Sequence, residues 1–196
     1  AFRDKVADEV DIRLIVHTNP ECVSQSINPF DHGSSLHTDM WKTQGLKQAW
    51  DAGEFDLAFG GARRDEEKSR AKERVFSFRT TKHVWDPKNQ RPELFELLNG
   101  RIQHGEHLRV FPISNWTELD VWNYIREENL ELPSLYFTHK RWVFERKGSL
   151  MPVSPLLERS EHEQPKEIWV RFRTVGDMSC TAAVTSTAKD IDRVIE

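Results

Sequence analysis

Cysteine is scarce in this sequence, long apolar runs are absent, and neither sign of charge is in large excess. The two cysteines, Cys22 and Cys180, rule out a disulfide framework and offer no metal-type pair spacing, so we expect idle thiols in a reducing cytoplasm. His104 and His107 are close in sequence, but a zinc site needs more ligands, and we expect no protein-bound metal. No apolar run approaches the ~20 residues of a membrane span, so no membrane partner is expected. The 28 basic and 32 acidic residues, a formal charge of −4, argue against general nucleic-acid binding.

The length of 196 residues and the apolar content of 37% suit one domain with one buried core. Hydrophobic patterns predict three strands that alternate with helices, the strands at 11–16, 55–59 and 109–113 and the helices at 35–50 and 117–129. Strand, short loop and capped helix form the repeating unit of a parallel sheet. The sequence therefore predicts an α/β protein with an open, mostly parallel sheet.

The remaining segments carry weaker patterns. We expect an irregular but packed stretch over 80–106, with one turn of helix at Glu93–Leu98. A hairpin around Lys147-Gly148 is predicted within 142–153, then an extended segment at 169–174 and a helix that starts at Asp190. Four prolines interrupt the chain after residue 132, which predicts a less regular C-terminal extension over 134–196.

Residues 55–79 carry the strongest chemical signal. The apolar run Leu57–Phe59 predicts a short buried strand that ends at Gly60-Gly61, where the backbone is able to turn sharply or approach a ligand. A dense run of charge follows, rich in arginine and lysine and mixed with carboxylates. Read as a helix, this run would be polar all round. It is either a solvated, salt-bridged surface or an anion site, because arginine binds phosphate oxygens in a bidentate manner.

Five stretches of the chain are similar to one family in their order and content: Gly60–Arg74, Trp85–Leu94, Arg109–Pro112, Ser114–Trp122 and Arg171–Gly176. The chain resembles the small-subunit family of bacterial ATP sulfurylase, in the PAPS-reductase-like branch of the adenine nucleotide α-hydrolase fold. The resemblance extends over nearly the whole chain. It implies a single, incomplete domain over 1–196 with a Rossmann-like open sheet.

The resemblance also implies an activity and partners. Members form adenosine 5′-phosphosulfate and pyrophosphate from sulfate and ATP with Mg2+ in sulfate assimilation, and no tightly bound cofactor is expected. They pair with a GTP-hydrolysing large subunit as a heterodimer or larger assembly in the cytoplasm. Phosphoryl transfer depends mainly on positioning and on charge neutralisation.

We expect the site to gather around the charged run and the next strand-to-helix junction, because free N–H groups at a helix N-terminus bind anions. Arg63 and Arg64 are expected on phosphates or sulfate, with Asp65 or Glu66 on Mg2+ or holding an arginine. The catalytic candidates are Arg63, Arg64 and Asp65. The substrate-binding candidates are Gly60, Gly61, Glu66, Lys68, Arg70, Arg74, Asn115, Trp116, Arg171 and Arg173.

The sequence departs from the family pattern in one respect. The phosphate loop, Ser-x-Gly-Lys-Asp-Ser after the first strand, does not occur in these 196 residues. We therefore expect the chain by itself to be inactive. Two alternatives remain open: a PAPS or APS reductase-like thiol enzyme, although Cys180 has no basic neighbour to lower its pKa, and a non-catalytic nucleotide-binding partner of a GTPase.

Overall fold

The structure is a computed structural model that describes residues 2–66, 68, 71–88, 90, 93 and 100–196. It divides into two compact units. We call Gly45–Tyr124 the central unit, and Ala1–Gln44 together with Ile125–Glu196 the terminal unit. The single domain that the sequence predicts stays a prediction.

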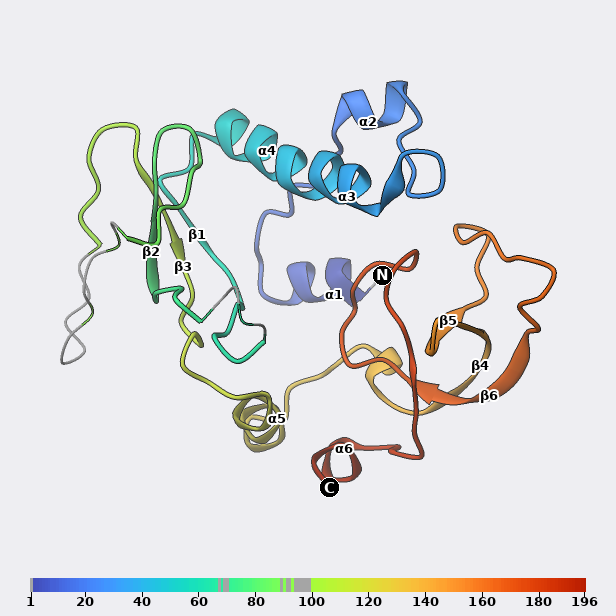
Figure 1. The fold of residues 1–196 in the computed structure, drawn as a ribbon. Coiled ribbons are helices and arrows are strands. Elements are labelled where there is room, and N and C mark those ends of the chain that lie inside the picture. Colours follow the sequence, from blue (N-terminus) through green and yellow to red (C-terminus); the bar gives the residue numbers. More distant parts are fainter. Residues whose placement is uncertain (1, 67, 69–70, 89, 91–92, 94–99) are drawn as a thin grey trace. The chain divides into compact units, whose positions relative to one another are not determined.

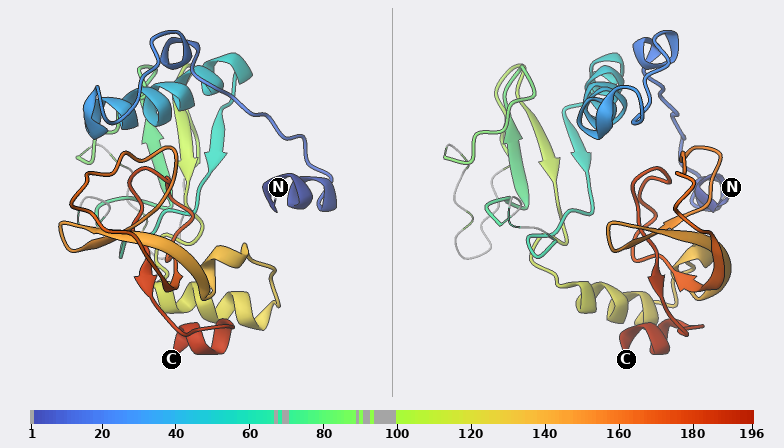
Figure 2. Two further views of the ribbon diagram at one scale, coloured as in Figure 1. Left: turned by 90° about the vertical axis from the view of Figure 1, so that its right-hand side faces the viewer. Right: turned by 45° about the vertical axis from the view of Figure 1, so that its right-hand side comes forward.

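The central unit is built on a three-stranded sheet (Figure 1). Helix α4 (Gly45–Gly53) precedes β1 (Leu57–Phe59), β2 (Phe76–Arg79) and β3 (His107–Val110). The strand order is β1-β3-β2, and the three strands run side by side in both views of Figure 2. Strand β1 is parallel to β3, whereas β2 is antiparallel to it. Apolar side chains pack on this sheet: Phe78, Leu108 and Val110, with Phe76 and Ile102 against them.

The terminal unit contains short helices and a four-stranded sheet. Its N-terminal helices are α1 (Phe2–Glu9), α2 (Pro20–Ser24), α3 (Gly33–Thr38) and the π-helical turn η1 (Asp39–Gln44). A 3-10 turn, η3 (Ser134–Tyr136), leads to strands β4 (His139–Arg146), β5 (Ser149–Pro152), β6 (Lys166–Arg171) and β7 (Val184–Thr185). These strands are antiparallel in the order β5-β4-β6-β7, and the chain closes with α6 (Ile191–Ile195). The largest buried cluster comprises Val143, Val170, Phe172 and Ala183.

The prediction of an α/β protein is confirmed, but the described strands do not form a mostly parallel sheet. Of the five strand pairings, only β1 with β3 is parallel. The sequence predicted the strands near 55–59 and 109–113 and the helix after Thr117, but it did not predict β2, the antiparallel strand that follows the charged run.

Two strand predictions need correction. Residues 11–16 form no strand, and Ile12 and Val16 are 59% and 61% exposed. Their apolar run has no strand partner in the described part of the chain, and a strand forms only where another completes its hydrogen bonds. Strand β1 exists but is not buried, because Leu57 and Phe59 are 45% and 73% exposed.

Several other predictions are confirmed. Residues 35–50 lie within the consecutive helices α3, η1 and α4. Helix α5 (Glu118–Glu127) follows Thr117, and α6 has Asp190 as its N-cap, with the carboxylate accepting from Arg193 N at 2.9 Å. The helical turn predicted at 93–98 lies largely outside the described residues.

Candidate active site

The site begins at the edge where the parallel strands β1 and β3 both end. Gly60 follows β1, and its backbone N–H donates to the carbonyl oxygen of Val110 at 2.9 Å. Its backbone also lies against the ring of Phe111, since a Cβ atom at this glycine would sit 3.0 Å from that ring. Parallel strands place their carboxyl ends at one edge of the sheet, and ligands of open α/β proteins bind at such edges. Gly60-Gly61 and the 111–117 loop therefore meet as the sequence predicted.

Arg64 ties three segments together at this edge. Its backbone N–H donates to Ser114 O at 2.9 Å, and its side-chain Nε donates to the carbonyl oxygen of Glu73 at 2.7 Å. Its Nη2 also lies 3.5 Å from Glu93 Oε2. The Arg64 side chain remains 31% exposed, so the guanidinium is held in place without being fully buried.

Arg63 is enclosed by the two carboxylates that follow it. Its Nε donates to Asp65 Oδ1 at 3.0 Å, and its Nη1 lies 3.4 Å from Glu66 Oε1. The second oxygen of Asp65 accepts from the backbone N–H of Glu118 at 2.9 Å. Asp65 thus links the arginine segment to the first residue of α5, where an anionic side chain is stabilised by the free N–H groups.

The start of α5 is closed by a reciprocal cap. Asp120 Oδ2 accepts from both the backbone N–H and the hydroxyl of Thr117 at 2.8 Å, and Asp120 N donates back to Thr117 Oγ1 at 3.2 Å. These hydrogen bonds from Thr117 lower the pKa of Asp120. Trp116 packs edge-on against Tyr124 at a centroid distance of 5.2 Å, and Asn115 is exposed. Trp116 is half-buried and lies two residues before Glu118, whose backbone N–H donates to Asp65.

The other predicted residues are distributed unevenly. The described residues between Ala62 and Arg74 form turns rather than an α-helix, in keeping with the absence of an apolar stripe. Lys68 is exposed, Arg74 is half-buried, and Arg70 lies outside the described residues. Arg171 on β6 and Arg173 just after it belong to the terminal unit, not to the central one.

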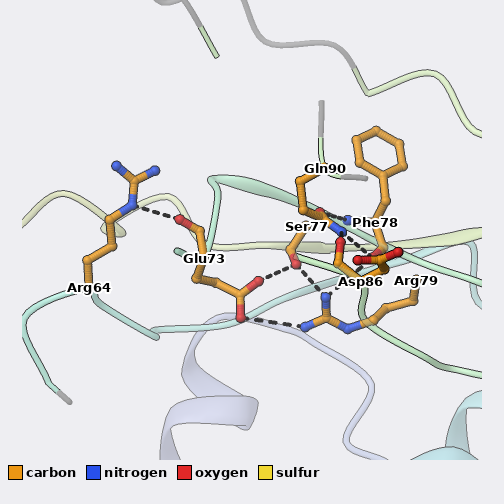
Figure 3. Close-up of polar contacts among 7 residues, drawn as sticks. All are labelled: Arg64, Glu73, Ser77, Phe78, Arg79, Asp86 and Gln90. Carbon is orange, nitrogen blue, oxygen red and sulfur yellow. Dashed lines mark hydrogen bonds and ion pairs between the residues drawn. The ribbon is translucent and has the colours of Figure 1, made fainter. Parts of the chain in front are cut away.

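A buried polar network that the sequence analysis did not single out follows the charged run (Figure 3). Glu73 accepts a hydrogen bond from the Ser77 hydroxyl, which in turn accepts from Arg79 Nη1 at 2.5 Å. Arg79 Nη2 lies 3.6 Å from Glu73 Oε2, and these two side chains are 6% and 10% exposed. Burial, with the nearby Arg109, lowers the pKa of Arg79 to about 10 in spite of Glu73, so Arg79 stays charged at neutral pH.

Glu93 is another residue that the sequence analysis did not single out. Its carboxylate accepts from the backbone N–H groups of Val75 and Phe76 at 3.1 and 2.7 Å, and it also faces Arg64. Gln90 continues the pattern, since its side chain donates to Phe78 O and accepts from Phe78 N at 3.2 and 2.9 Å. Both residues satisfy the open edge of β2 from outside. Their place in the Trp85–Leu94 motif was a signal, but nothing in the sequence connected it with β2.

The site presents arginine side chains that are able to bind an anion, but few free carboxylate oxygens that would bind a metal ion. Arg63 and Arg64 lie on adjacent residues of one tethered loop, whereas Asp65 already accepts two hydrogen bonds. Within the described residues there is no group of three or more His, Cys, Asp or Glu side chains able to hold a metal ion. In the same part of the chain no helix is long and apolar enough to cross a membrane.

Comparison with known proteins defines the class. Residues 1–183 match the family described as the phosphoadenosine phosphosulfate reductase domain, and the chain belongs to this family. Over 197 aligned residues it is 59% identical to the sulfate adenylyltransferase subunit 2 of Nocardia farcinica. It is 58% and 57% identical to the proteins of the same name from Shewanella sp. strain W3-18-1 and Shewanella pealeana.

These alignments cover the whole of this chain but not the whole of the relatives. The chain spans 64% of the length of the Nocardia farcinica protein and 65% of the length of the two Shewanella proteins. The resemblance to the ATP sulfurylase small-subunit family that the motifs carry is thus confirmed over all of the residues at hand.

Proposed function

We propose that the protein to which this chain belongs is the small subunit of a sulfate adenylyltransferase. It joins sulfate to the adenylyl group of ATP, yielding adenosine 5′-phosphosulfate and pyrophosphate in sulfate assimilation. The relatives that align over the full length of this chain carry this name. The relatives reported above are not named as thiol-dependent reductases.

The observation that carries the proposal is the tethered pair Arg63-Arg64 at the carboxyl edge of β1 and β3. Adenylyl transfer needs fixed positive charge next to the phosphates, because a sulfate oxygen attacks the α-phosphorus while pyrophosphate leaves with the negative charge. Arg64 is fixed by Glu73 O and Glu93, and still exposes 31% of its side chain. Such a guanidinium is pre-oriented and reachable by an anion.

The two arginines differ in how they are held. Arg63 is 16% exposed and faces two carboxylates, Asp65 and Glu66, whereas Arg64 pairs with one carboxylate. We assign Arg64 to the phosphates or sulfate, and Arg63 to the positioning of Asp65 and the start of α5. Mg2+ enters with ATP, and both oxygens of Asp65 already accept hydrogen bonds, which favours magnesium ligands from the nucleotide and water.

The name of the relatives, subunit 2, supports a partner subunit. We propose that this partner is the GTP-hydrolysing large subunit, because the phosphate–sulfate anhydride is costly to form and needs coupling to a second reaction. We also propose a cytoplasmic protein with the adenine nucleotide α-hydrolase fold. The free thiols Cys22 and Cys180 and the parallel β1–β3 pair support these two statements.

The test is sulfate-dependent pyrophosphate release by the full-length protein with its GTPase partner, ATP, Mg2+ and GTP. We expect Arg64→Ala to lower kcat/KM by about 100-fold, the typical effect of removing one group that stabilises transition-state charge. Arg64→Lys should recover only part of the loss, because lysine keeps the charge without the bidentate geometry.

Lys72→Ala is the matched control, since Lys72 is an exposed cation of the same segment. It should leave kcat/KM within about twofold, as most exposed substitutions do. Loss of activity in both variants would assign a general electrostatic role to the segment. Pyrophosphate release that does not depend on sulfate in the wild type would refute the transferase itself.

A further inference from the structure

A cavity of about 260 Å³ lies in the terminal unit, beside the β5-β4-β6-β7 sheet. Its walls are largely apolar and are formed by Leu135, Pro152, Phe172, Val175 and Met178. This volume is slightly below the 300–1,000 Å³ typical of small-molecule sites. The cavity therefore suits a ligand smaller than a nucleotide.

One cation, Arg141 of β4, lines this cavity. Its guanidinium carbon lies 5.3 Å from the centre of the Phe172 ring. Within the described part of the chain, its side chain has neither a hydrogen bond nor an ion pair. By contrast, the neighbouring Lys140 lies 3.8 Å from Glu167. A guanidinium that is half-buried, stacked on an aromatic ring and without an anion is a ready anion-binding group.

The second polar group at the cavity is also a hydrogen-bond donor. Thr181 Oγ1 accepts from the backbone N–H of Asp177 at 2.7 Å, so its hydroxyl hydrogen is available to a ligand. The carboxylate of Asp177 accepts from Ser179 N at 2.9 Å and lies 3.5 Å from Lys42. Ser179 and Lys42 thus engage the Asp177 carboxylate, and the two polar groups that line the cavity, Arg141 and Thr181, select a hydrogen-bond acceptor.

The loop that lines one side of the cavity, residues 175–181, is fixed by its backbone. Gly176 has φ +54°, and a Cβ atom there would lie 2.0 Å from Thr181 Oγ1. Only glycine accommodates both conditions at no cost. Met178 is held through its sulfur, to which Ser154 Oγ donates at 3.1 Å. The cavity wall is therefore set by specific contacts.

We infer that this cavity binds a small organic monoanion, a carboxylate or sulfonate with an apolar body of about the size of naphthalene. The anionic group pairs with Arg141 and accepts from Thr181, while the apolar body packs between Phe172, Pro152 and Met178. The inference is independent of the proposed transferase reaction, because every residue that carries it belongs to the terminal unit.

The test uses 2-naphthoate as the probe and the ¹³C-labelled methyl group of Met178 as the reporter, assigned with a Met178→Leu variant. We expect a saturable shift of the Met178 signal in the full chain, with the Met40 signal unchanged. Arg141→Gln should weaken the affinity at least about tenfold, because charge-assisted hydrogen bonds are lost. The neutral analogue 2-naphthalenemethanol should bind at least about tenfold more weakly to the wild type for the same reason.

Lys140→Gln is the matched control: it removes the same charge one residue away on β4, from a side chain that is 59% exposed. It should leave the affinity within about twofold, as expected of an exposed charge. Equal binding of the anion by the wild type and Arg141→Gln would overturn the inference, and so would equal binding of 2-naphthoate and its neutral analogue. The second comparison needs no variant and therefore does not depend on whether Arg141→Gln folds.

Discussion

Carboxylates lie beside three arginines of the central unit. Asp65 holds Arg63, Glu93 faces Arg64, and Glu73 faces Arg79 across 3.6 Å. An arginine that must meet an anionic ligand has to be held without being neutralised. Arg64 satisfies this condition better than Arg79, because Arg79 is almost completely buried.

The Glu73–Ser77–Arg79 network predicts strong energetic coupling (Figure 3). Glu73→Gln should destabilise the central unit by about 3 kcal/mol, because it leaves the buried Arg79 charge unpaired. Adding Arg79→Met should cost at least about 1 kcal/mol less than the sum of the single effects. The measurement is native-state hydrogen exchange of the Leu108 amide, which donates to Asp56 O at 2.9 Å.

The exposed pair Lys140–Glu167 provides the control, since its N–O distance of 3.8 Å is close to the 3.6 Å of the buried pair. Its coupling energy, measured through hydrogen exchange of the Phe172 amide in the same unit, which donates to Leu135 O at 2.9 Å, should stay below about 0.5 kcal/mol. Additive effects of the Glu73 and Arg79 substitutions would mean that the buried network does not act as a unit.

The sequence predicted part of this site for a physical reason. Parallel strands must end at one edge, so Gly60-Gly61 and Asn115–Thr117 were bound to approach each other. Glu93 and Gln90 escaped prediction because their partners, the N–H groups of Phe76 and Phe78, are 17 and 12 residues away in sequence and belong to an edge strand of unknown direction. No periodicity encodes such a tether.

At the scale of elements, turn residues predicted secondary structure better than apolar runs did. Lys147 and Gly148 both adopt positive φ, 51° and 78°, which is the geometry of a two-residue hairpin turn, and Arg146 pairs with Ser149 beside it. The hairpin prediction is confirmed because the turn itself carries the signal. Residues 11–16 had only an apolar run, which requires a partner strand to become a strand.

Helix α4 packs on two histidines, and this contact should be sensitive to pH. The Trp50 ring lies 4.7 Å from that of His107, and His83 lies 4.4 Å from His107 on another side. Burial lowers the pKa of His107, and so do His83, Arg109 and Arg79, against a smaller opposite effect of Asp51. The unfolded chain therefore takes up a proton at this side chain near pH 6.5, and the folded protein does so only at lower pH.

The sign of the effect follows. Below about pH 6.5 the unfolded state binds more protons than the folded state. The central unit therefore becomes less stable as the pH decreases, by at most about 1.4 kcal/mol per pH unit for one group. His107→Gln should flatten this dependence between pH 7 and 5. His104→Gln, at an exposed position nearby, should keep the slope of the wild type. The measurement is the unfolding free energy from urea titrations at each pH. Equal slopes of this free energy against pH in the wild type and both variants would exclude His107 as the cause.

At the scale of the whole molecule, the two units carry different groups that respond to acid. In the terminal unit, Arg146 Nε and Nη2 donate to the two oxygens of Glu163 at 2.6 and 2.7 Å. These hydrogen bonds lower the pKa of Glu163 to about 2, with a further one from Ser160 N. A carboxyl with a depressed pKa stabilises the fold above its unfolded value near 4.5, and this contribution disappears as the pH falls toward 2.

Acidification should therefore weaken the units in two separate windows. The central unit loses stability first, from about pH 6.5 downward through His107, and the terminal unit follows between about pH 4.5 and 2 through Glu163. Hydrogen-exchange protection of the Leu108 amide should report the first window. Protection of the Phe172 amide, which donates to Leu135 O at 2.9 Å, should report the second.

Glu163→Gln separates this account from general acid unfolding. The variant should show weaker Phe172 protection than the wild type at pH 6. The difference should shrink toward pH 2, because native Glu163 also becomes protonated as the pH approaches its pKa of about 2. Glu161→Gln removes an exposed carboxylate two residues away and should leave protection unchanged. If the units unfold separately, the pH at which each amide loses its protection should follow the group that titrates in its own unit. If both amides instead lose protection in the same pH window, the two units unfold together.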